Sequence, residues 1–200
     1  GLCNLNCYYC FVSKELRQGN TKNGRWSTAK EVVDWFVKEK NGIGILRISG
    51  GEPFLAPQFL KDVTKELVER DLFNCYLVID TNLCAPVENY MTSLDYILDA
   101  RIPFAVIGCL KGMDDDDFIF NTQMHSSRLG DQLANLEVIY KMLYPKDYGY
   151  YGQLFVYLTE ITQKRLEYDV KMGLRTIFSR LAMIHPKLPL RMTILKIKEY

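Results

Sequence analysis

The stretch "IGILRISGGEPF" at residues 43–54 contains the pattern that decides the fold of this 200-residue chain. Its first six residues form a short, mostly apolar run that is typical of a buried strand, and a polar loop with two glycines follows. Pro57 then suits the first turn of a helix whose apolar residues recur at helical spacing. One such strand, loop and helix make a β/α unit, and repetition of the unit builds a parallel sheet.

The same pattern recurs along the chain, with no internal repeat and no linker that would divide it. It predicts an α/β fold of one domain, residues 1–200, in which helices cover both faces of a parallel sheet. The predicted strands are residues 43–48, 75–79, 104–110, 154–158 and 190–197. The predicted helices begin at residue 28, at 57, near 90, near 129 and near 163, and the last is interrupted at Gly173.

Polar residues follow four of these strands. They are "SGGEP" at residues 49–53, "DTN" at 80–82, "KG" at 111–112 and "TE" at 159–160. The carboxyl ends of parallel strands meet at one edge of a sheet, and in β/α barrels the chemistry lies at that edge. We therefore expect the functional site to be formed by these four segments.

Composition and charge argue against several classes of protein. The chain is 48% apolar and 24% charged with a net charge of +1, so it has no general attraction to nucleic acid or to an anionic membrane. Its longest apolar runs are too short to span a bilayer, and no secretory leader is visible. We expect a cytoplasmic protein whose six cysteines stay reduced and are available to bind metal.

The loop "CNLNCYYC" at residues 3–10 holds Cys3, Cys7 and Cys10 at the spacing C-x3-C-x2-C. Such a loop can curl its thiolates around one soft metal centre. A structural zinc ion normally takes four protein ligands, and the sequence has no second cysteine pair to complete the set. An iron–sulfur cluster also prefers thiolates, and three of them would leave one iron of a four-iron cluster open. The residues alone leave a cluster, a zinc ion and free thiols as alternatives.

Together, "CNLNCYYC" and "SGGEP" resemble the motifs of the radical S-adenosylmethionine (radical SAM) superfamily. Its signature is a C-x3-C-x-aromatic-C loop, here with Tyr9 before the last cysteine, and a Gly-Gly-Glu-Pro motif ends its second strand. The resemblance spans the chain and implies a partial, TIM-like (β/α)6 barrel with a parallel sheet. The first strand of that barrel would precede Gly1, so we expect a fragment that lacks this strand and is trimmed at its C-terminus as well.

The resemblance also implies the cofactors. A 4Fe-4S cluster would be bound by the three cysteines, and its open iron would take the amino and carboxylate groups of S-adenosyl-L-methionine (SAM). An electron from a flavodoxin- or ferredoxin-type donor would split the sulfonium into methionine and a 5′-deoxyadenosyl radical, which abstracts hydrogen from a substrate. The sequence identifies no further catalytic residue. Tyr9 would lie near the adenine, and the methionine amino group would be held by Gly50, Gly51, Glu52 and Pro53.

A narrower resemblance concerns "IDTN" at residues 79–82 and "CLKG" at 109–112, which are similar to strand ends of glycyl-radical activating enzymes. It implies that Asp80, Thr81 and Lys111 face the cofactors and that the substrate is a protein backbone glycine. Leu83 and Cys109 depart from that pattern, since they replace a glycine and an aspartate. Modification of RNA or of a small metabolite by the same radical is an alternative. A non-catalytic zinc or iron–sulfur module is another, from a different class.

Plainer structural roles stand beside these assignments. The "DTN" segment favours turns and helix caps, and a solvated loop lysine is the plain reading of Lys111. The run "DDDD" at residues 114–117 lacks alternating oxygen ligands and a turn glycine, so it predicts a solvated loop leading into a helix rather than a cation site. Ordinary buried thiols are expected at Cys75, Cys84 and Cys109.

Overall fold

The computed structural model describes residues 2–20, 22, 24–39, 44–144, 151–159 and 166–195. Its centre is a five-stranded sheet in which all neighbouring strands are parallel. All five predicted strands are confirmed, with ends shifted by a few residues; residue 43 and the strand predicted beyond residue 195 lie outside the described part. The strands are β1 (Ile45–Ile48), β2 (Tyr76–Thr81), β3 (Phe104–Leu110), β4 (Gly152–Thr159) and β5 (Met192–Leu195).

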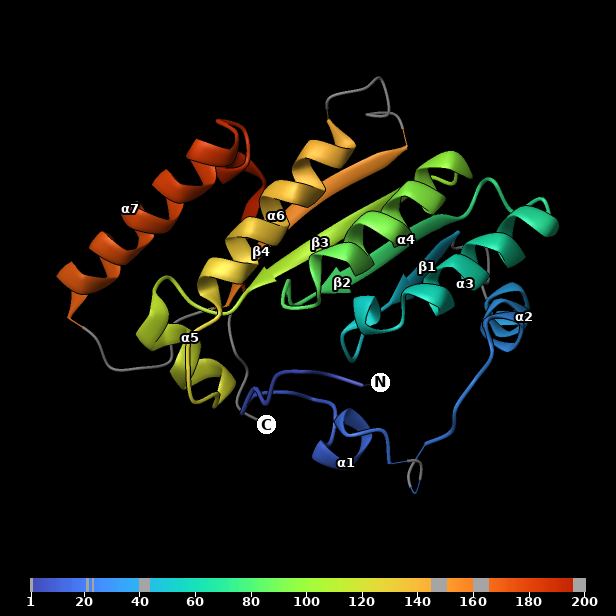
Figure 1. Ribbon diagram of the computed structural model, residues 1–200, viewed down its shortest axis with the longest axis horizontal. Coiled ribbons are helices and arrows are strands. Elements are labelled where there is room, and N and C mark those ends of the chain that lie inside the picture. The colour runs from blue at the N-terminus through green and yellow to red at the C-terminus, as the bar shows by residue number, and fades with distance from the viewer. Residues whose placement is uncertain are drawn as a thin grey trace.

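The order of strands in the sheet follows their order in the sequence, β1 to β5. Crossovers between parallel strands are right-handed, so a sheet whose strand order never reverses receives all its connecting helices on one face. Five helices lie on that face, and each packs against the next. Figure 1 shows them side by side. They are α2 (Ala29–Glu39), α3 (Pro57–Glu69), α4 (Val87–Asp99), α6 (Leu129–Leu143) and α7 (Glu167–Ile184).

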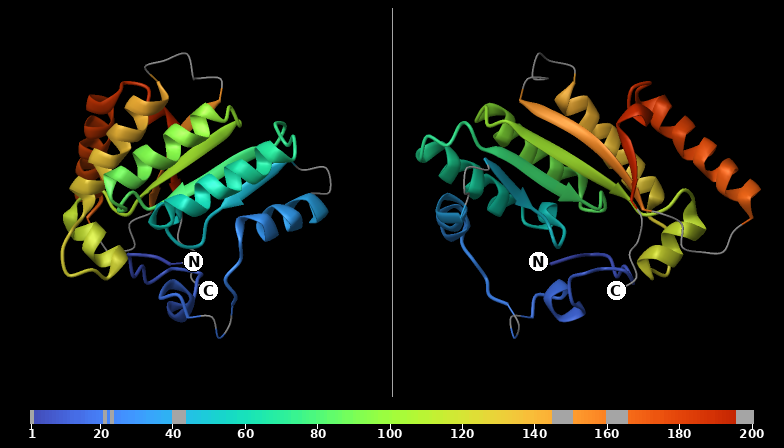
Figure 2. Two further views of the ribbon diagram at one scale, coloured as in Figure 1. Left: turned by 45° about the vertical axis from the view of Figure 1, so that its right-hand side comes forward. Right: turned by 180° about the vertical axis from the view of Figure 1, so that it is seen from behind.

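The prediction that helices cover both faces of the sheet is therefore wrong for the described residues. Seen from behind, the sheet presents its second face without a covering helix (Figure 2, right). This face is the inner wall of an open barrel, because in the described residues β1 and β5 stand at opposite edges and do not pair. The α/β fold and the partial, TIM-like barrel are confirmed.

Helix α7 also corrects an expectation. The predicted interruption at Gly173 is wrong, because α7 runs unbroken from Glu167 to Ile184. A Cβ atom on Gly173 would lie 2.6 Å from Cε of Met113, so the glycine provides room for a neighbouring side chain. The glycine therefore serves close packing between α7 and the segment that follows β3.

Four short helices complete the described structure. Asp114 caps the N-terminus of α5, where its side chain accepts a hydrogen bond from the Asp117 backbone at 2.9 Å. Three further aspartates occupy the first turn of α5, where negative charge is favourable, so the helix start predicted from "DDDD" is confirmed. The short helices are α1 (Lys14–Arg17), η1 (Pro53–Leu55), α5 (Asp115–Thr122) and η3 (Pro189–Arg191).

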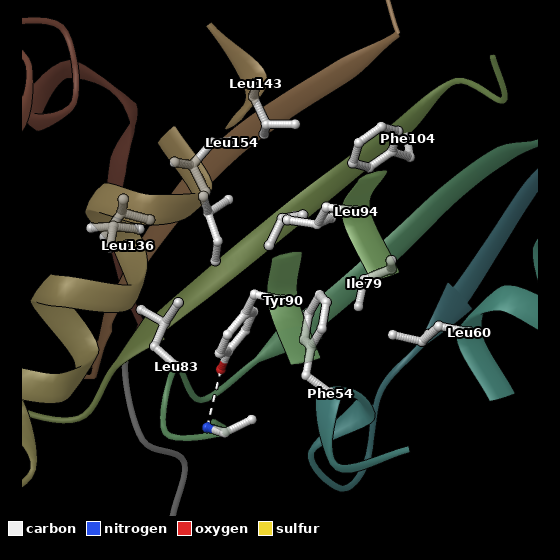
Figure 3. Close-up of a cluster of buried hydrophobic side chains, with 14 of the residues drawn as sticks. Phe54, Leu60, Ile79, Leu83, Tyr90, Leu94, Phe104, Leu136, Leu143 and Leu154 are labelled. Carbon is white, nitrogen blue, oxygen red and sulfur yellow. Dashed lines mark hydrogen bonds between the residues drawn. The ribbon is translucent and has the colours of Figure 1, made fainter. Parts of the chain in front are cut away.

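The core lies between the sheet and its helices (Figure 3). Phe54 of η1 and Tyr90 of α4 are fully buried, and their ring centroids lie 4.4 Å apart. The dashed line in Figure 3 is the hydrogen bond from the backbone N–H of Ala85 to the Tyr90 hydroxyl, 3.2 Å long. The core thereby extends to the loop that follows β2. None of the described helices is both long enough and apolar enough to cross a membrane.

The N-terminal segment, with α1, crosses the end of the sheet toward which the strands point (Figure 2, right). It is tied there by hydrogen bonds to two of the strand-end loops. The backbone N–H of Glu52 donates to the Leu2 carbonyl at 2.7 Å, and the Asn4 side chain donates to the Cys84 carbonyl at 2.7 Å. These bonds bring the cysteine loop over the carboxyl ends of the strands.

Candidate functional site

One cavity lies between the cysteine loop and the strand ends, and most of the predicted site residues line it. Residues of three strand-end segments, "SGGEP", "DTN" and "KG", contribute to its wall, together with Cys109 and Asn82. Glu52 and Pro53 are the two predicted site residues that do not line it. The predicted residues in the wall are Cys3, Cys7, Tyr9, Cys10, Gly50, Gly51, Asp80, Thr81 and Lys111.

The three cysteines surround this cavity from one side. Cys7 is buried, whereas Cys3 and Cys10 are half-buried, and burial raises the pKa of the Cys3 thiol. The loop is held by its backbone, since the N–H of Cys3 donates to the Arg17 carbonyl at 3.0 Å and that of Cys10 to the Cys7 carbonyl at 3.2 Å. In the described residues no three His, Cys, Asp or Glu side chains come close enough together to hold a single metal ion. The thiols line a shared space instead of converging on one point.

Tyr9 joins the cysteine loop to the far side of the sheet. Its hydroxyl is hydrogen-bonded to Oγ1 of Thr159, at the end of β4, at a distance of 3.2 Å. Burial raises the pKa of Tyr9 to about 12, so its hydroxyl stays protonated. The Tyr9 ring therefore forms a fixed part of the cavity wall. Glu160, predicted to follow Thr159 at this strand end, lies outside the described residues.

Gly50 explains why the loop after β1 needs glycine. Its backbone has φ of +93°, a left-handed conformation that residues with a side chain rarely adopt. A Cβ added there would meet only Cγ2 of Val12, at an ordinary 3.7 Å, so the requirement comes from the backbone rather than from crowding. This turn presents the segment from Ser49 to Gly51 to the cavity.

Glu52 does not line the cavity and is 3% exposed. Its carboxylate accepts three hydrogen bonds, as a buried polar group requires. Its Oε1 accepts from the Thr81 hydroxyl at 2.9 Å and from the Phe54 N–H at 3.1 Å, and its Oε2 accepts from the Asn82 N–H at 2.6 Å. Glu52 thus bridges the loops that follow β1 and β2. Pro53, buried beside it, begins η1.

Burial raises the pKa of Glu52 to about 7, although its hydrogen bonds act in the opposite direction. Between the ordinary pKa of 4.5 and about 7, the folded protein keeps a proton that the unfolded chain has released. The free energy of unfolding of the metal-free protein is therefore expected to fall as the pH rises through this window, by about 3 kcal/mol, and to level off above it. Urea denaturation from pH 4.5 to 8 measures this, and Glu52→Gln should lose the slope. Parallel pH profiles of the two proteins would contradict the assignment.

Asp80 points to the inner face of the sheet and lines the cavity. Its Oδ2 accepts two hydrogen bonds from the Arg47 guanidinium, 2.9 Å from Nε and 2.7 Å from a terminal nitrogen. Its Oδ1 is buried and has no hydrogen-bond partner in the described part of the chain. A buried carboxylate oxygen without a partner is an available acceptor for a ligand. Thr81, the next residue, uses its hydroxyl within the protein, on Glu52 and Tyr90.

Lys111 follows β3 and is anchored through its backbone. Its N–H donates to Oε1 of Gln132 at 3.1 Å, and its carbonyl accepts from the Asn121 side chain at 2.8 Å. The ammonium lies 5.9 Å from the centroid of the Tyr9 ring. Burial alone would lower the pKa of Lys111, but Tyr9 and the thiols of Cys109 and Cys7, when ionised, raise it overall. The Lys111 side chain is a cavity-lining group that can carry a positive charge.

The N-terminal part of the chain matches a known protein family. Residues 1–88 match the model described as the Radical SAM superfamily, a range that includes the cysteine loop and the strand ends after β1 and β2. The resemblance to the radical SAM superfamily is confirmed. No protein of curated function matches the chain.

Two solved structures share the fold of this chain. The chain resembles a crystal structure of Streptococcus suis SuiB bound to S-adenosylmethionine, with a TM-score of 0.63 and 12% identity over 100% of this chain and 39% of that one. It also resembles Streptococcus suis SuiB bound to the precursor peptide SuiA, with a TM-score of 0.61 and 13% identity over 99% of this chain and 38% of that one. At these identities the likeness shows the fold alone. The chain spans about two fifths of the length of SuiB.

Sequence reasoning missed two amide side chains that order the loop after β2. Gln132 of α6 donates to the Asn82 and Cys109 carbonyls, at 2.5 and 3.1 Å, and Asn135 donates to the Leu83 and Ala85 carbonyls, at 2.9 and 3.1 Å. Both helix residues are buried. Their spacing of three residues on the apolar face of α6 was an available signal, because buried amides are rare unless they are hydrogen-bonded.

Leu83, whose carbonyl accepts a hydrogen bond from Asn135, has an unusual left-handed backbone conformation. The resemblance to activating enzymes implies a glycine at this position, and Leu83 indeed has a left-handed backbone, with φ of 61°. Its side chain is fully buried, its N–H donates to the Thr81 hydroxyl at 2.9 Å, and its carbonyl accepts from Asn135. A left-handed leucine is strained by about 1–3 kcal/mol, which the surrounding contacts offset.

Proposed function

We propose that this chain is the core of a radical SAM enzyme, in which Cys3, Cys7 and Cys10 bind a 4Fe-4S cluster and SAM binds beside it. The observation that carries the proposal is the single cavity whose wall combines the three cysteines with the ends of β1, β2 and β3. Thiolates are suitable ligands for such a cluster, and three of them leave one iron open. The superfamily match over residues 1–88 supports the same reading.

The other residues of the cavity fit an amino-acid ligand. The unpartnered Oδ1 of Asp80 is an acceptor for an ammonium group, and the Lys111 ammonium suits a carboxylate. The backbone of Ser49 to Gly51 can approach a ligand closely because it carries little side-chain bulk. When bound, the cluster would supply the electron that cleaves SAM, while these residues orient the cofactor and exclude water.

Glu52 takes a supporting role in this proposal. Its carboxylate is occupied by three protein hydrogen bonds and does not line the cavity. It fixes the loop after β1 against the loop after β2, so that Gly50 and Gly51 stay at the cavity wall. Recognition of the SAM amino group would then fall to the loop backbone and to Asp80.

A peptide is the substrate class that we propose for the whole enzyme. The support is the likeness to SuiB, which has been crystallised bound to a precursor peptide. A glycyl-radical activase would be a special case, since its substrate is also a polypeptide, and Asp80, Thr81 and Lys111 all line the cavity as that narrower resemblance implies. The enzyme would need an external one-electron donor of the flavodoxin or ferredoxin type.

Anaerobic reconstitution tests the proposal. The protein, incubated with iron, sulfide and reductant, is expected to retain about four irons and four sulfides per chain. The reduced protein is then expected to cleave SAM to methionine and 5′-deoxyadenosine, measured by liquid chromatography. Retention of about one zinc ion without iron or sulfide would support a structural zinc module instead. A loaded cluster that never cleaves SAM, in the full-length protein, would indicate a non-catalytic iron–sulfur module.

A further inference from the structure

We propose that Asn82 is a positioning residue that donates a hydrogen bond to the Cys3 sulfur and thereby raises the reduction potential of the cluster. The proposal rests on the proposed function, because it assumes that Cys3 is a cluster ligand. It goes beyond that function in assigning a chemical role to the Asn82 side chain, for which the "DTN" motif predicts only a place at the strand end. Its observation is a distance of 3.6 Å between Nδ2 of Asn82 and Sγ of Cys3.

The orientation of the Asn82 amide is fixed by its oxygen. Oδ1 accepts a hydrogen bond from the backbone N–H of Cys84 at 2.8 Å, so the nitrogen has to face the other way, toward the cysteine loop. The amide nitrogen has two hydrogens, and the loop offers two acceptors. One is Oδ1 of Asn4, 2.8 Å away, and the other is the Cys3 sulfur. The amide nitrogen of Asn82 therefore uses both of its hydrogens in bonds to the cysteine loop.

The backbone of Asn82 is also fixed by hydrogen bonds on both sides of the residue. Its N–H donates to Oε2 of Glu52 at 2.6 Å, and its carbonyl accepts from Nε2 of Gln132 at 2.5 Å. These partners come from the loop after β1 and from α6, two elements that belong to the core rather than to the cysteine loop. Asn82 is only 6% exposed. The donor is consequently preorganised by the scaffold before any cluster is bound.

A donor at this position affects the two redox states of a cluster differently. Reduction adds negative charge to the cluster and its thiolate ligands, and an N–H group aimed at a ligand sulfur stabilises that charge. Water competes weakly with this bond because Asn82 is buried. The hydrogen bond should therefore favour the reduced cluster, and its loss should make the cluster harder to reduce.

The test measures the midpoint potential of the reconstituted cluster without SAM, by redox titration followed by electron paramagnetic resonance. In Asn82→Ser the hydroxyl can still accept from the Cys84 N–H, as serine does in turns, but it is too short to donate to Cys3. The midpoint is expected to move to a more negative potential, with iron and sulfide content unchanged. In Asn82→Ser a water molecule could enter beside the shorter side chain and donate to Cys3 instead. Asn82→Leu has a side chain similar in size to asparagine and leaves no room for that water, so the midpoint should shift in the same direction.

Asn135→Ser is the matched control. It removes an amide of the same type and burial, and it loosens the same loop at the Leu83 and Ala85 carbonyls, but Asn135 donates to no cysteine in the described structure. Its midpoint should equal that of the wild type. An unchanged midpoint in both Asn82 variants, or an equal shift in Asn135→Ser, would overturn the proposal. If both Asn82 variants lose the cluster while Asn135→Ser keeps it, the proposal is also overturned, because Asn82 would then be needed for cluster assembly. Failure of the wild type to load a cluster would instead refute the proposed function.

Discussion

Cys7→Ala is expected to abolish assembly of the cluster. The Cys7 side chain is buried at the wall of the cavity, and only two other thiols of the loop share that wall with it. With two thiolates the loop can no longer surround a four-iron cluster. Residues 3–10 contain no further cysteine that could replace Cys7 as a ligand. After anaerobic reconstitution and desalting, iron and sulfide in Cys7→Ala should fall to background, and the absorption of the cluster in the visible range should be absent.

Cys75→Ala provides the matched control. Cys75 is buried, with 1% exposure, but it precedes β2 at the end of the sheet away from the cavity and does not line it. The variant should keep the iron and sulfide content of the wild type, at the expense of some stability. Equal loss of iron from both variants would refute the assignment of Cys7 as a ligand, because the effect would then come from folding.

Glu52→Ala should destabilise the metal-free protein by about 3–5 kcal/mol, because it leaves buried hydrogen-bond donors unsatisfied and opens a small cavity. The donors are the backbone N–H groups of Phe54 and Asn82 and the hydroxyl of Thr81. The measurement is urea denaturation at pH 6, where the raised pKa of about 7 keeps Glu52 largely protonated and no charge penalty offsets the loss.

The control for this experiment is Glu69→Ala. Glu69 ends α3 on the surface, where its carboxylate lies 3.7 Å from the Lys65 ammonium and both side chains are exposed. Exposed ion pairs contribute little, so the change in unfolding free energy should stay below about 0.5 kcal/mol. If Glu52→Ala costs no more than Glu69→Ala, Glu52 does not hold the two loops together.

The sequence was sufficient to predict the main strands and helices of the fold and to predict which strand ends line the cavity. The apolar run at residues 104–110 forms β3, which is buried on both faces, and the run at 75–79 forms most of β2, in which alternate residues are buried. Polar residues placed directly after such strands meet at one edge for geometric reasons, and the cavity combines Gly50, Asp80 and Lys111 in this way. The positive φ of Gly50 was not predicted, although glycine is the residue that adopts it without strain.

Side-chain directions within the loops could not be predicted. Glu52 and Asp80 are both acidic residues at strand ends, yet one turns into the core and the other faces the cavity. The difference depends on the loop backbone and on donors from distant elements, such as Asn82 and Arg47, which spacing in the sequence does not reveal. Helices were predicted on both faces of the sheet, but they cover only one in the described residues. The prediction failed because mostly apolar strands are found both in sheets covered on two faces and in the wall of a barrel.

The bond between Tyr9 and Thr159 has a consequence for how the protein is made. The two residues are 150 positions apart. The bond from Asn4 to the Cys84 carbonyl likewise cannot form until Cys84, 80 positions later, has been synthesised. At about 5–20 residues per second of synthesis, the delay between Tyr9 and Thr159 is on the order of ten seconds. During that time the three thiols leave the ribosome before most of the wall that will enclose them exists. The proposed cluster can therefore reach its final surroundings only after the synthesis of β4.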